Sequence, residues 1–339
     1  MTALKNKVYP ADIIPWNGVT KQRSDLIKAA ATLRLRLRLT GAITIAGGTG
    51  AGTVNAESVA RLINWIRILE GGKPTIEIDP RAAVQMYNLE HEHPAKITTL
   101  AALGAQVGTA IELAYEIAFS SRLLANPYEV TYVPQFQQDG TKKLQIEVEW
   151  APDIKAAMST GNDGVWTQAT AIQMEVEQYF DDLSNVAPIY VPRLRRLDTG
   201  NIVGAQQGLS LDLQMDARSR GLLIHALSDN ITDGGVLTAN LELTGSDTYL
   251  KRVDPVMVIQ DMAGLHPGFD GTQVGYYWLP FTHNGRLGNL FDPRQDPQLK
   301  LRMDVNKGTG AIGVLRVYDF QLVGIPGTTR VLPDNSPLK

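Results

Sequence analysis

The sequence predicts an all-β protein made of two similar antiparallel β-sandwiches in tandem. The first observation is a plan that occurs once in each half: a β-type run meets Asp-Pro, a helix-like stretch follows, and His-Pro ends it. These dipeptides are Asp79-Pro80 with His93-Pro94, and Asp254-Pro255 with His266-Pro267. The second observation is that each half continues with a Tyr-rich strand, an alternating strand and a long strand ending in an aromatic residue. Each copy is far longer than a solenoid repeat, so the repeating unit is a whole domain.

The first copy opens with the stretch from Leu33 to Leu39, in which Leu and Arg alternate strictly. A period of two puts four leucines on one face and three arginines on the other, as in a half-buried strand. Gly71-Gly72 is expected to form a tight turn, because glycine enters positive φ without strain. The other elements expected here are a helix at 81–90 and strands at 62–69, 75–78, 115–119, 144–150 and 171–180.

The second copy opens with another alternating strand, Leu209 to Met215, and has a turn at Asp233-Gly234-Gly235. Its other strands are expected at 222–227, 236–243, 249–253, 276–281, 299–305 and 311–320. Strands at this spacing, joined by turns and few helices, favour antiparallel sandwiches. Each copy has room for about eight strands, the number in a jelly roll of two Greek keys. Alternation alone does not distinguish a jelly roll from an immunoglobulin-like sandwich, but the helix after each Asp-Pro favours two tandem eight-stranded jelly rolls.

The domain boundaries follow from stretches that lack a strand pattern. The first stretch is broken by prolines and a glycine, and a short helix is expected there with Ser24 as its N-cap. A second stretch, rich in proline and arginine, separates the two patterns. The expected parts are an N-terminal arm at 1–31, a first jelly roll at 32–185, a linker at 186–206, a second jelly roll at 207–325 and a tail at 326–339.

Composition excludes several classes of function. The chain of 339 residues is 44% hydrophobic and 20% charged, as in an ordinary globular protein. It has no Cys, which rules out disulfides, thiolate metal sites and a Cys nucleophile. A net charge of -3 gives no overall bias toward nucleic acid, so no sequence-specific nucleic-acid partner is expected. The N-terminus lacks the apolar region of a secretion signal, and the most apolar window, 100–119, carries charges that argue against a membrane helix.

The positive charge is concentrated at the N-terminus. Residues 1–38 hold eight Lys and Arg against two Asp, a balance of +6. Such an arm suits phosphates or lipid headgroups, and it also suits a solvated segment whose charges keep the chain soluble. The candidate contact residues, for a membrane, nucleic acid or a neighbouring copy, are Lys5, Lys7, Lys21, Arg23 and Lys28.

Sites for catalysis, cofactors or metals are not expected. The glycine-rich run Gly47–Gly52 lacks the spacing of a nucleotide loop and is interpreted as a hairpin turn. His91 and His93 resemble a metal pair but lie at a helix end rather than on a strand. Two carboxylate pairs on strands share one face each and are interpreted as solvated outer faces, and four tryptophans near strands are interpreted as core. These residues are Glu147, Glu149, Glu175, Glu177, Trp65, Trp150, Trp166 and Trp278.

Three segments carry a resemblance to a known family. They are the opening strand 37–44 with its return 59–69, the helix after Asp79-Pro80, and the strand Tyr276–Phe281 followed by Gly288-Asn289 and the strand 298–301. Together they resemble the double jelly-roll major capsid proteins of tailless, membrane-containing icosahedral phages, the tectivirus type. The resemblance covers roughly residues 30–325. One departure is that the strand 276–281 is similar to the first jelly roll of the tectivirus protein but lies here in the second half, with a weaker copy at 109–150.

The resemblance implies a self-assembling structural protein without catalytic residues. Three chains would form a trimer of pseudo-hexagonal outline, and trimers would tile an icosahedral shell over an internal membrane, with the N-terminal arm underneath. It also implies a vertex, or penton, partner and a place in a virion assembled in the host cytoplasm. Two other classes stay open: a β-sandwich carbohydrate- or receptor-binding spike, which needs exposed aromatic residues, and a two-domain cupin-type enzyme with His91 and His93 as metal ligands.

Overall fold

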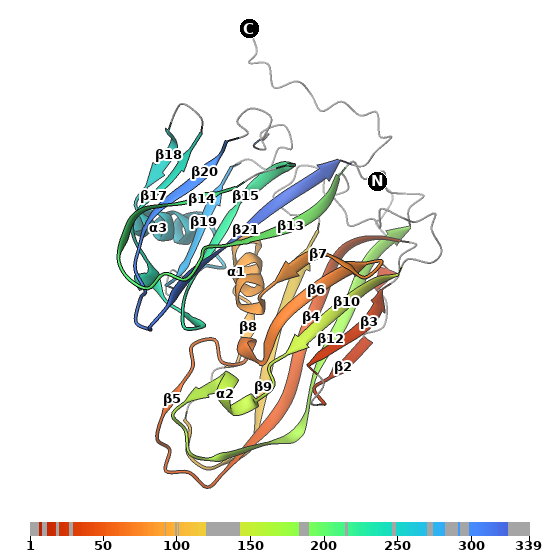
Figure 1. Ribbon diagram of the computed structural model, residues 1–339. Coiled ribbons are helices and arrows are strands. Elements are labelled where there is room, and N and C mark those ends of the chain that lie inside the picture. The colour runs from red at the N-terminus through yellow and green to blue at the C-terminus, as the bar shows by residue number, and fades with distance from the viewer. Residues whose placement is uncertain are drawn as a thin grey trace. The chain divides into compact units, whose positions relative to one another are not determined.

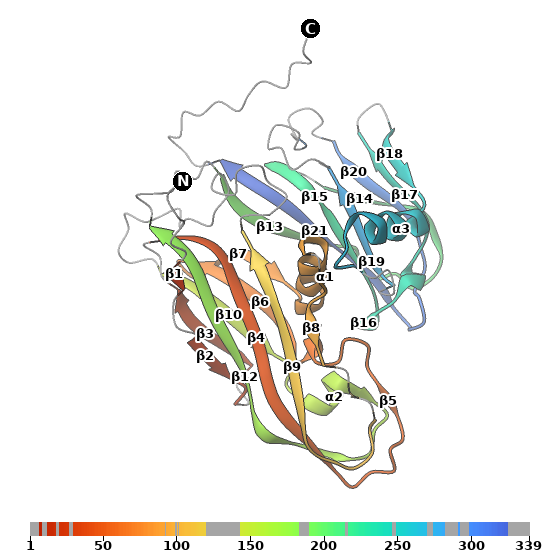
Figure 2. The same cartoon turned by 180° about the vertical axis from the view of Figure 1, so that it is seen from behind.

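The computed structural model describes two compact units. The described residues are 7–8, 12–17, 20–26, 30–91, 93–98, 100, 102–119, 143–182, 190–213, 216–245, 249–269, 274–281, 291 and 298–324. The first unit comprises Met1–Tyr87, Pro94–Phe119 and Tyr132–Ala187, and the second comprises Asn88–His93, Ser120–Thr131 and Pro188–Lys339. Within each unit, antiparallel sheets face one another (Figures 1 and 2).

The larger sheet of the first unit has six strands. Its order is β1 (Lys7–Val8), β12 (Val165–Asp182), β4 (Ala30–Ala46), β9 (Gln106–Ala118) and β8 (Lys96–Ile97), with β2 (Asp12–Pro15) also paired to β12. The facing sheet has the order β3 (Lys21–Leu26), β10 (Leu144–Trp150), β6 (Ile63–Glu70) and β7 (Lys73–Ile78). Smaller elements are β5 (Thr53–Val54) paired with β11 (Ser159–Thr160), a 3-10 turn at Ala60–Leu62, α1 (Pro80–Glu90) and α2 (Ile154–Met158).

The core of this unit contains the apolar side chains that alternate with polar ones along β4. Leu35, Leu37 and Leu39 of β4 are fully buried, and so are Ile68 of β6 and Ile146 of β10. A strand that alternates Leu and Arg can bury only one face, so β4 covers the sandwich interior on one side and presents arginines on the other. This arrangement confirms the predicted face assignment.

The second unit also has two sheets. One has the order β13 (Tyr190–Asp198), β21 (Gly313–Gly324), β15 (Arg218–Ser228) and β16 (Ile231–Thr232), with β19 (Tyr276–Pro280) also paired to β15. The other has the order β14 (Gln206–Asp212), β20 (Lys300–Val305), β17 (Leu237–Thr244) and β18 (Tyr249–Val253). A 3-10 turn at Gly234–Val236 and α3 (Pro255–Leu265) complete this unit.

Eight strands follow the same plan in both units. In chain order they are β2, β3, β4, β6, β7, β9, β10 and β12 in the first unit, and β13, β14, β15, β17, β18, β19, β20 and β21 in the second. In each unit the first, eighth, third and sixth strands form one sheet, and the second, seventh, fourth and fifth form the other. This is the two-Greek-key order of a jelly roll, with a helix between the fifth and sixth strands. The predicted repeat and fold class are therefore confirmed.

The first strands of each copy lie where no strand was expected. Residues 12–15 and 21–26 of the expected arm form β2 and β3, which pair with β12 and β10, and residues 190–198 of the expected linker form β13, which pairs with β21. The helix expected from Ser24 is also absent, because Ser24 lies in β3 opposite Ile146. β3 buries only this serine, so it has no apolar alternation to reveal it. The expected tail, 326–339, lies outside the described residues.

Candidate functional site

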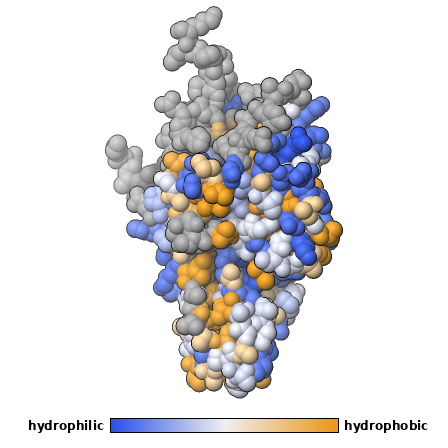
Figure 3. Space-filling view, turned by 90° about the vertical axis from the view of Figure 1, so that its left-hand side faces the viewer, coloured by the Kyte–Doolittle hydropathy of each residue, from blue (hydrophilic) through white to orange (hydrophobic). Residues whose placement is uncertain are grey.

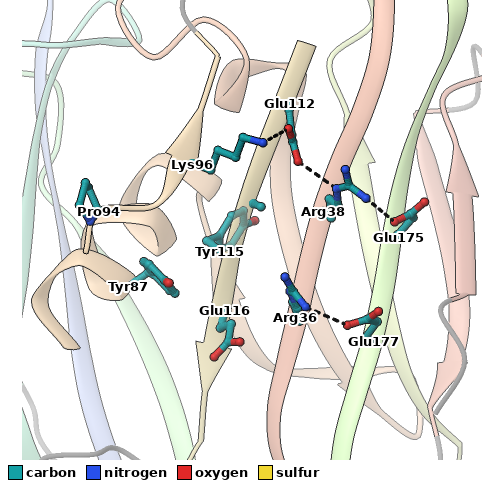
Figure 4. Close-up of a pocket in the computed structure, with 11 residues that line it drawn as sticks. Arg36, Arg38, Tyr87, Pro94, Lys96, Glu112, Tyr115, Glu116, Glu175 and Glu177 are labelled. Carbon is teal, nitrogen blue, oxygen red and sulfur yellow. Dashed lines mark hydrogen bonds and ion pairs between the residues drawn. The ribbon is translucent and has the colours of Figure 1, made fainter. Parts of the chain in front are cut away.

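The outer face of β4 carries a ladder of ion pairs that reaches both neighbouring strands. Arg34 lies 3.2 Å from Glu116 of β9, and Arg36 lies 3.7 Å from Glu177 of β12. Arg38 bridges the two sides, at 3.0 Å from Glu112 and 3.8 Å from Glu175 (Figure 4). The register explains this arrangement. On β12, Glu177 and Glu175 stand directly opposite Arg36 and Arg38, and on β9, Glu116 and Glu112 are the diagonal neighbours of Arg34 and Arg38.

The ladder lines a hollow of about 420 Å³ in the first unit. Tyr87 at the end of α1, Pro94 and Lys96 also line the hollow, and Lys96 reaches Glu112 at 2.5 Å (Figure 4). The hydrogen bond from Lys96, followed by that from Arg38, holds the pKa of Glu112 below its usual range. The hollow is polar, and its carboxylates lie beside the cations of Arg36, Arg38 and Lys96.

A second ladder covers the outer face of the facing sheet. Arg67 of β6 lies 2.7 Å from Glu77 of β7 and 3.2 Å from Glu147 of β10, and it also binds Glu149 at 2.5 Å. On the far side of β10, Arg23 of β3 binds Glu147 at 2.7 Å. Burial alone would raise the pKa of Glu147, but the hydrogen bonds from Arg23 and Arg67 outweigh burial and lower it.

The two carboxylate pairs predicted to be solvated differ from each other. Glu175 and Glu177 are partly exposed in the β4 ladder, as expected. Glu147 is only 4% exposed, which corrects the prediction for this residue. It lies beneath two arginines, and such a carboxylate is stable in a sheet only when it is paired. None of these four carboxylates stands alone in an apolar environment of the kind that prepares a general acid.

The structure describes three of the five basic residues that were expected as contact residues. Lys21 lies 3.5 Å from Glu149, and Arg23 binds Glu147, so both side chains take part in the second ladder while remaining about half exposed. Lys7 lies on β1, opposite Phe180 of β12. Lys5 and Lys28 lie outside the described residues.

The glycine-rich run forms a loop that is closed by a carboxylate. Asp163 accepts hydrogen bonds from the backbone N–H and the hydroxyl of Thr49, at 3.0 and 3.1 Å. These bonds lower the pKa of Asp163. Gly52 has a φ of +98°, and a Cβ there would lie 2.5 Å from the carbonyl oxygen of Thr160. The N–H of Thr49 thus binds a carboxylate of the protein itself, in agreement with a turn rather than a phosphate cradle.

Neither the histidine pair nor the tryptophans assemble into a site. His91 follows α1 and is half-buried, and His93 is exposed. Among the described residues there is no group of three or more His, Cys, Asp or Glu that could hold a metal ion. Every tryptophan and phenylalanine that the structure describes is buried or half-buried, so nothing in this part of the chain favours a carbohydrate platform. No helix in the described ranges is long and apolar enough to cross a membrane.

Sequence reasoning missed two features of the second unit. The first is the outer face of α3, where Val256, Met257 and Leu265 are more than half exposed. The unusually apolar sequence of this helix was a signal, but without the fold it was indistinguishable from a buried helix. The second is Asp319 of β21, a fully buried carboxyl in the middle of an apolar strand.

Comparison with solved structures shows which known proteins have a similar fold. The chain is similar to the major capsid protein of Sulfolobus turreted icosahedral virus, with a TM-score of 0.68 and 11% identity over 94% of this chain and 97% of that one. The chain has the double jelly-roll fold of viral major capsid proteins. It is similar also to the major capsid protein of bacteriophage PM2 (TM-score 0.57, 11% identity, 95% of this chain and 100% of that chain). A third similar structure is VP54 of the virus PBCV-1 (TM-score 0.59, 9% identity, 93% and 92%).

These identities are so low that the likeness lies in the fold. No family model and no curated protein sequence matches the chain. The resemblance found from the sequence is nevertheless confirmed at the level of fold, because the matched structures are covered almost end to end.

Proposed function

We propose that this chain is a major capsid protein, which self-assembles as pseudo-hexagonal homotrimers that tile an icosahedral virion shell over an internal membrane. The observation that carries the proposal is the tandem pair of jelly rolls with identical strand order, in the fold of viral capsid proteins. Two similar domains in each of three chains give six similar domains around one axis, which is the outline of a tile with six neighbours.

The surface chemistry of the first unit supports a structural role. Both outer faces carry arginine–carboxylate ladders whose charges compensate one another, and the sandwich interior is filled by aliphatic side chains. Exposed ion pairs contribute little stability each, but they leave polar faces with compensated charges that suit contact with other proteins. We propose that the chain has no enzymatic activity.

The partners follow from the same proposal. Besides itself and neighbouring capsomers, the chain would contact a vertex, or penton, protein in the virion after assembly in the host cytoplasm. The N-terminal residues Lys5, Lys7 and Lys28 are the candidates for contact with the internal membrane. The lysine and arginine excess of the first 38 residues supports this contact, because basic segments bind anionic lipid surfaces. We propose no sequence-specific contact with nucleic acid.

The proposal is tested by the mass and the assemblies of the purified protein. A trimer of this 37.0 kDa chain has a mass of 111 kDa, three times 37.0. We expect light scattering to give this mass, and electron microscopy of particles to show tiles with six-sided outlines. A chain that stays monomeric at all concentrations, or that forms only twofold dimers, would contradict the proposal. Binding to liposomes with anionic lipids, compared with neutral ones, tests the membrane contact separately.

A further inference from the structure

The loop between the seventh and eighth strands of the second unit is held by side chains of a neighbouring loop. We call this loop, which joins β20 to β21, the strap (306–312). Four consecutive N–H groups of the strap, at 309–312, donate to side chains over 2.6–3.1 Å. The acceptors are Asp233, Ser228 and Asp229, at the end of the third strand, β15, and in the loop that follows it. The strap thus depends on this second loop for much of its backbone hydrogen bonding.

Asp233 is the central acceptor. Its Oδ2 atom accepts hydrogen bonds from the N–H and the hydroxyl of Thr309, at 2.6 and 2.7 Å, and its Oδ1 atom accepts one from the N–H of Gly235 at 2.7 Å. The strap has a glycine beside this carboxylate. Gly308 has a φ of +70°, and a Cβ there would lie 2.5 Å from the Oδ2 atom of Asp233. Only glycine lets the strap backbone pass this close to the carboxylate.

The first unit joins its corresponding two loops with the same pair of residue types. The carboxylate of Asp163 accepts hydrogen bonds from the N–H and the hydroxyl of Thr49, at 3.0 and 3.1 Å. Here the aspartate follows the seventh strand and the threonine follows the third, whereas the second unit has the two residue types exchanged. A contact copied with a duplicated sequence would keep each residue in the same loop. The units therefore share the joining of these loops and not one stretch of sequence.

Asp163 lies in surroundings with little charge. It is the only charged residue between 156 and 174, and the loop of Thr49 has no charged residue between 40 and 56. Figure 3 shows this end of the first unit at the bottom, where white and orange residues predominate. Since neither range offers a cation to pair with it, the carboxylate serves as a hydrogen-bond acceptor for the opposite loop.

The hydrogen bonds lower the pKa of both carboxyls. For Asp163, the bonds from Thr49 are the largest cause. For Asp233, burial acts in the opposite direction, but the bonds from Thr309 and Gly235 outweigh burial and lower the pKa below 3.8. A carboxyl whose pKa is lowered in the folded state stabilises that state above its ordinary pKa, and this contribution is lost as the pH falls through the folded value.

Other titratable groups also face these carboxyls. Lys155 of α2 faces Asp163 and lowers its pKa further. Tyr277 of β19 faces Asp233, and Asp229 binds the same strap. Tyr277 is neutral in acid, because burial and the charge of Asp233 raise its pKa to about 12. Lysines are protonated throughout the acid range. A response of these loops to acid therefore belongs to the aspartates.

We propose that Asp163 and Asp233 are latches, which hold the loops after the third and seventh strands together at one end of each jelly roll and release them on protonation. A protonated carboxyl keeps fewer acceptor positions and gains a donor that faces N–H groups. The sheets stay folded on release, because β15 and β21 pair through their own backbones from Ser228 and Gly313 inward. Any surface that the two loops form together exists only while the latch is closed.

The test is hydrogen–deuterium exchange of the full-length protein, with each rate divided by the rate of an unfolded peptide at the same pH. In the wild type, we expect protection at Thr309 to be constant from about pH 7 to about pH 5 and to be lost below about pH 3.8, before β15 and β21 lose theirs. Asp233→Asn should speed exchange at Thr309 about 10-fold or more at neutral pH, leave the strands unchanged and remove the acid step there. Asp212→Asn is the matched control, because Asp212 pairs with Lys300 at the opposite end of β20 from the strap.

A second pair of variants tests the first latch without removal of a charge. Thr49→Val removes the hydroxyl donor but keeps the N–H bond to Asp163. Exchange at position 49 should therefore rise less than it does in Asp163→Asn, and the acid step should remain. Thr53→Val is the matched control, because Thr53 is exposed in the same loop, and it should exchange at position 49 like the wild type.

Each outcome decides a part of the inference. Equal exchange at Thr309 in the wild type and Asp233→Asn overturns the second latch, and equal exchange at Thr49 in the wild type and Asp163→Asn overturns the first. Exchange that rises equally in loops and strands overturns local opening, as does an Asp233→Asn protein that does not fold. Protection that strap and strands lose together in acid overturns release by protonation. The inference goes beyond the proposed function and does not rest on it, because the readout compares segments of one chain.

Discussion

Replacement of Asp319 with Asn should remove a pH-dependent part of the stability of the second jelly roll. Asp319 lies on β21 and has no exposed surface. Its carboxyl accepts hydrogen bonds from the Ser219 hydroxyl at 2.5 Å and from the Gln321 amide at 2.7 Å. Gln321 in turn accepts a hydrogen bond from Arg193 at 2.8 Å, so the buried carboxyl belongs to a connected polar cluster.

The sign of the effect follows from the direction of the pKa shift. Burial raises the pKa of Asp319 from 3.8 to about 6, although the bonds from Ser219 and Gln321 and the nearby arginines lower it. The folded protein therefore binds this proton more tightly than the unfolded chain does. The stabilisation is complete below the unfolded pKa and is lost as the pH rises through the folded one. Acidification from neutral pH should make this unit more stable.

The magnitude follows from the same two pKa values. Between about pH 7.5 and about pH 5, the proton on Asp319 should contribute about 1.4 kcal/mol to the free energy of unfolding, and about 3 kcal/mol once the pH lies well below 3.8. Other groups titrate over the same range, so the informative quantity is the difference between wild type and Asp319→Asn. In the variant the same acidification should give about 1.4 kcal/mol less stabilisation.

The assay is denaturant unfolding of both proteins at the two pH values, followed by tryptophan fluorescence in proteins whose four other tryptophans are replaced by Phe, so that buried Trp278 reports on its own unit. Ser210→Ala, at an exposed position of β14, controls for the effect of a neutral substitution in this unit. The reasoning would be refuted by identical pH dependence of the wild type and the variant. A wild type that loses stability specifically through Asp319 on acidification would reverse the sign and refute it equally.

Three further substitutions or deletions test the first unit. Leu37→Ala should lower the free energy of unfolding by about 2–5 kcal/mol, because the side chain is fully buried in the β4 core face, and denaturant melts would measure it. Arg67→Met should lower the free energy of unfolding by about 1.5–3 kcal/mol, because buried Glu147 keeps Arg23 but loses Arg67, and the loss should shrink when Glu147→Gln is combined with it in a double-mutant cycle. Deletion of residues 1–26 should lower the melting temperature in a calorimetric scan sharply, since it removes β2 and β3 from their sheets.

The sequence was most informative where a strand is half-buried. The alternation from Leu33 to Leu39 predicts both the strand and its faces, and the two Asp-Pro steps predict both helices. These signals are local: a period of two and an aspartate cap depend on residues near one another in the chain. The order of the repeated elements then predicts the tandem fold without knowledge of any contact.

The elements that sequence reasoning missed depend on partners far away in the chain. β3 lies at the edge of its sheet, and its polar side chains pair with those of β10, as Arg23 does with Glu147. β13 carries arginines because it lies beside β21, where Gln321 binds Arg193. A strand whose charged side chains pair with a distant strand has the sequence pattern of a basic linker or arm. For this reason the sequence did not predict the first strands of either copy.

The two kinds of surface differ in how their contacts respond to salt, and this bears on the order of assembly. The ladders on β4 and β6 consist of charges that are partly exposed, so contacts made through them are weakened by salt. The exposed Val256, Met257 and Leu265 of α3 are apolar, so a contact made through them would persist or strengthen as salt rises. A shell needs strong contacts within each tile and weaker ones between tiles, because errors in tiling must be able to dissociate. If apolar contacts close the proposed trimer and the ladders join trimers, raising the salt concentration separates the shell into intact trimers before any trimer comes apart.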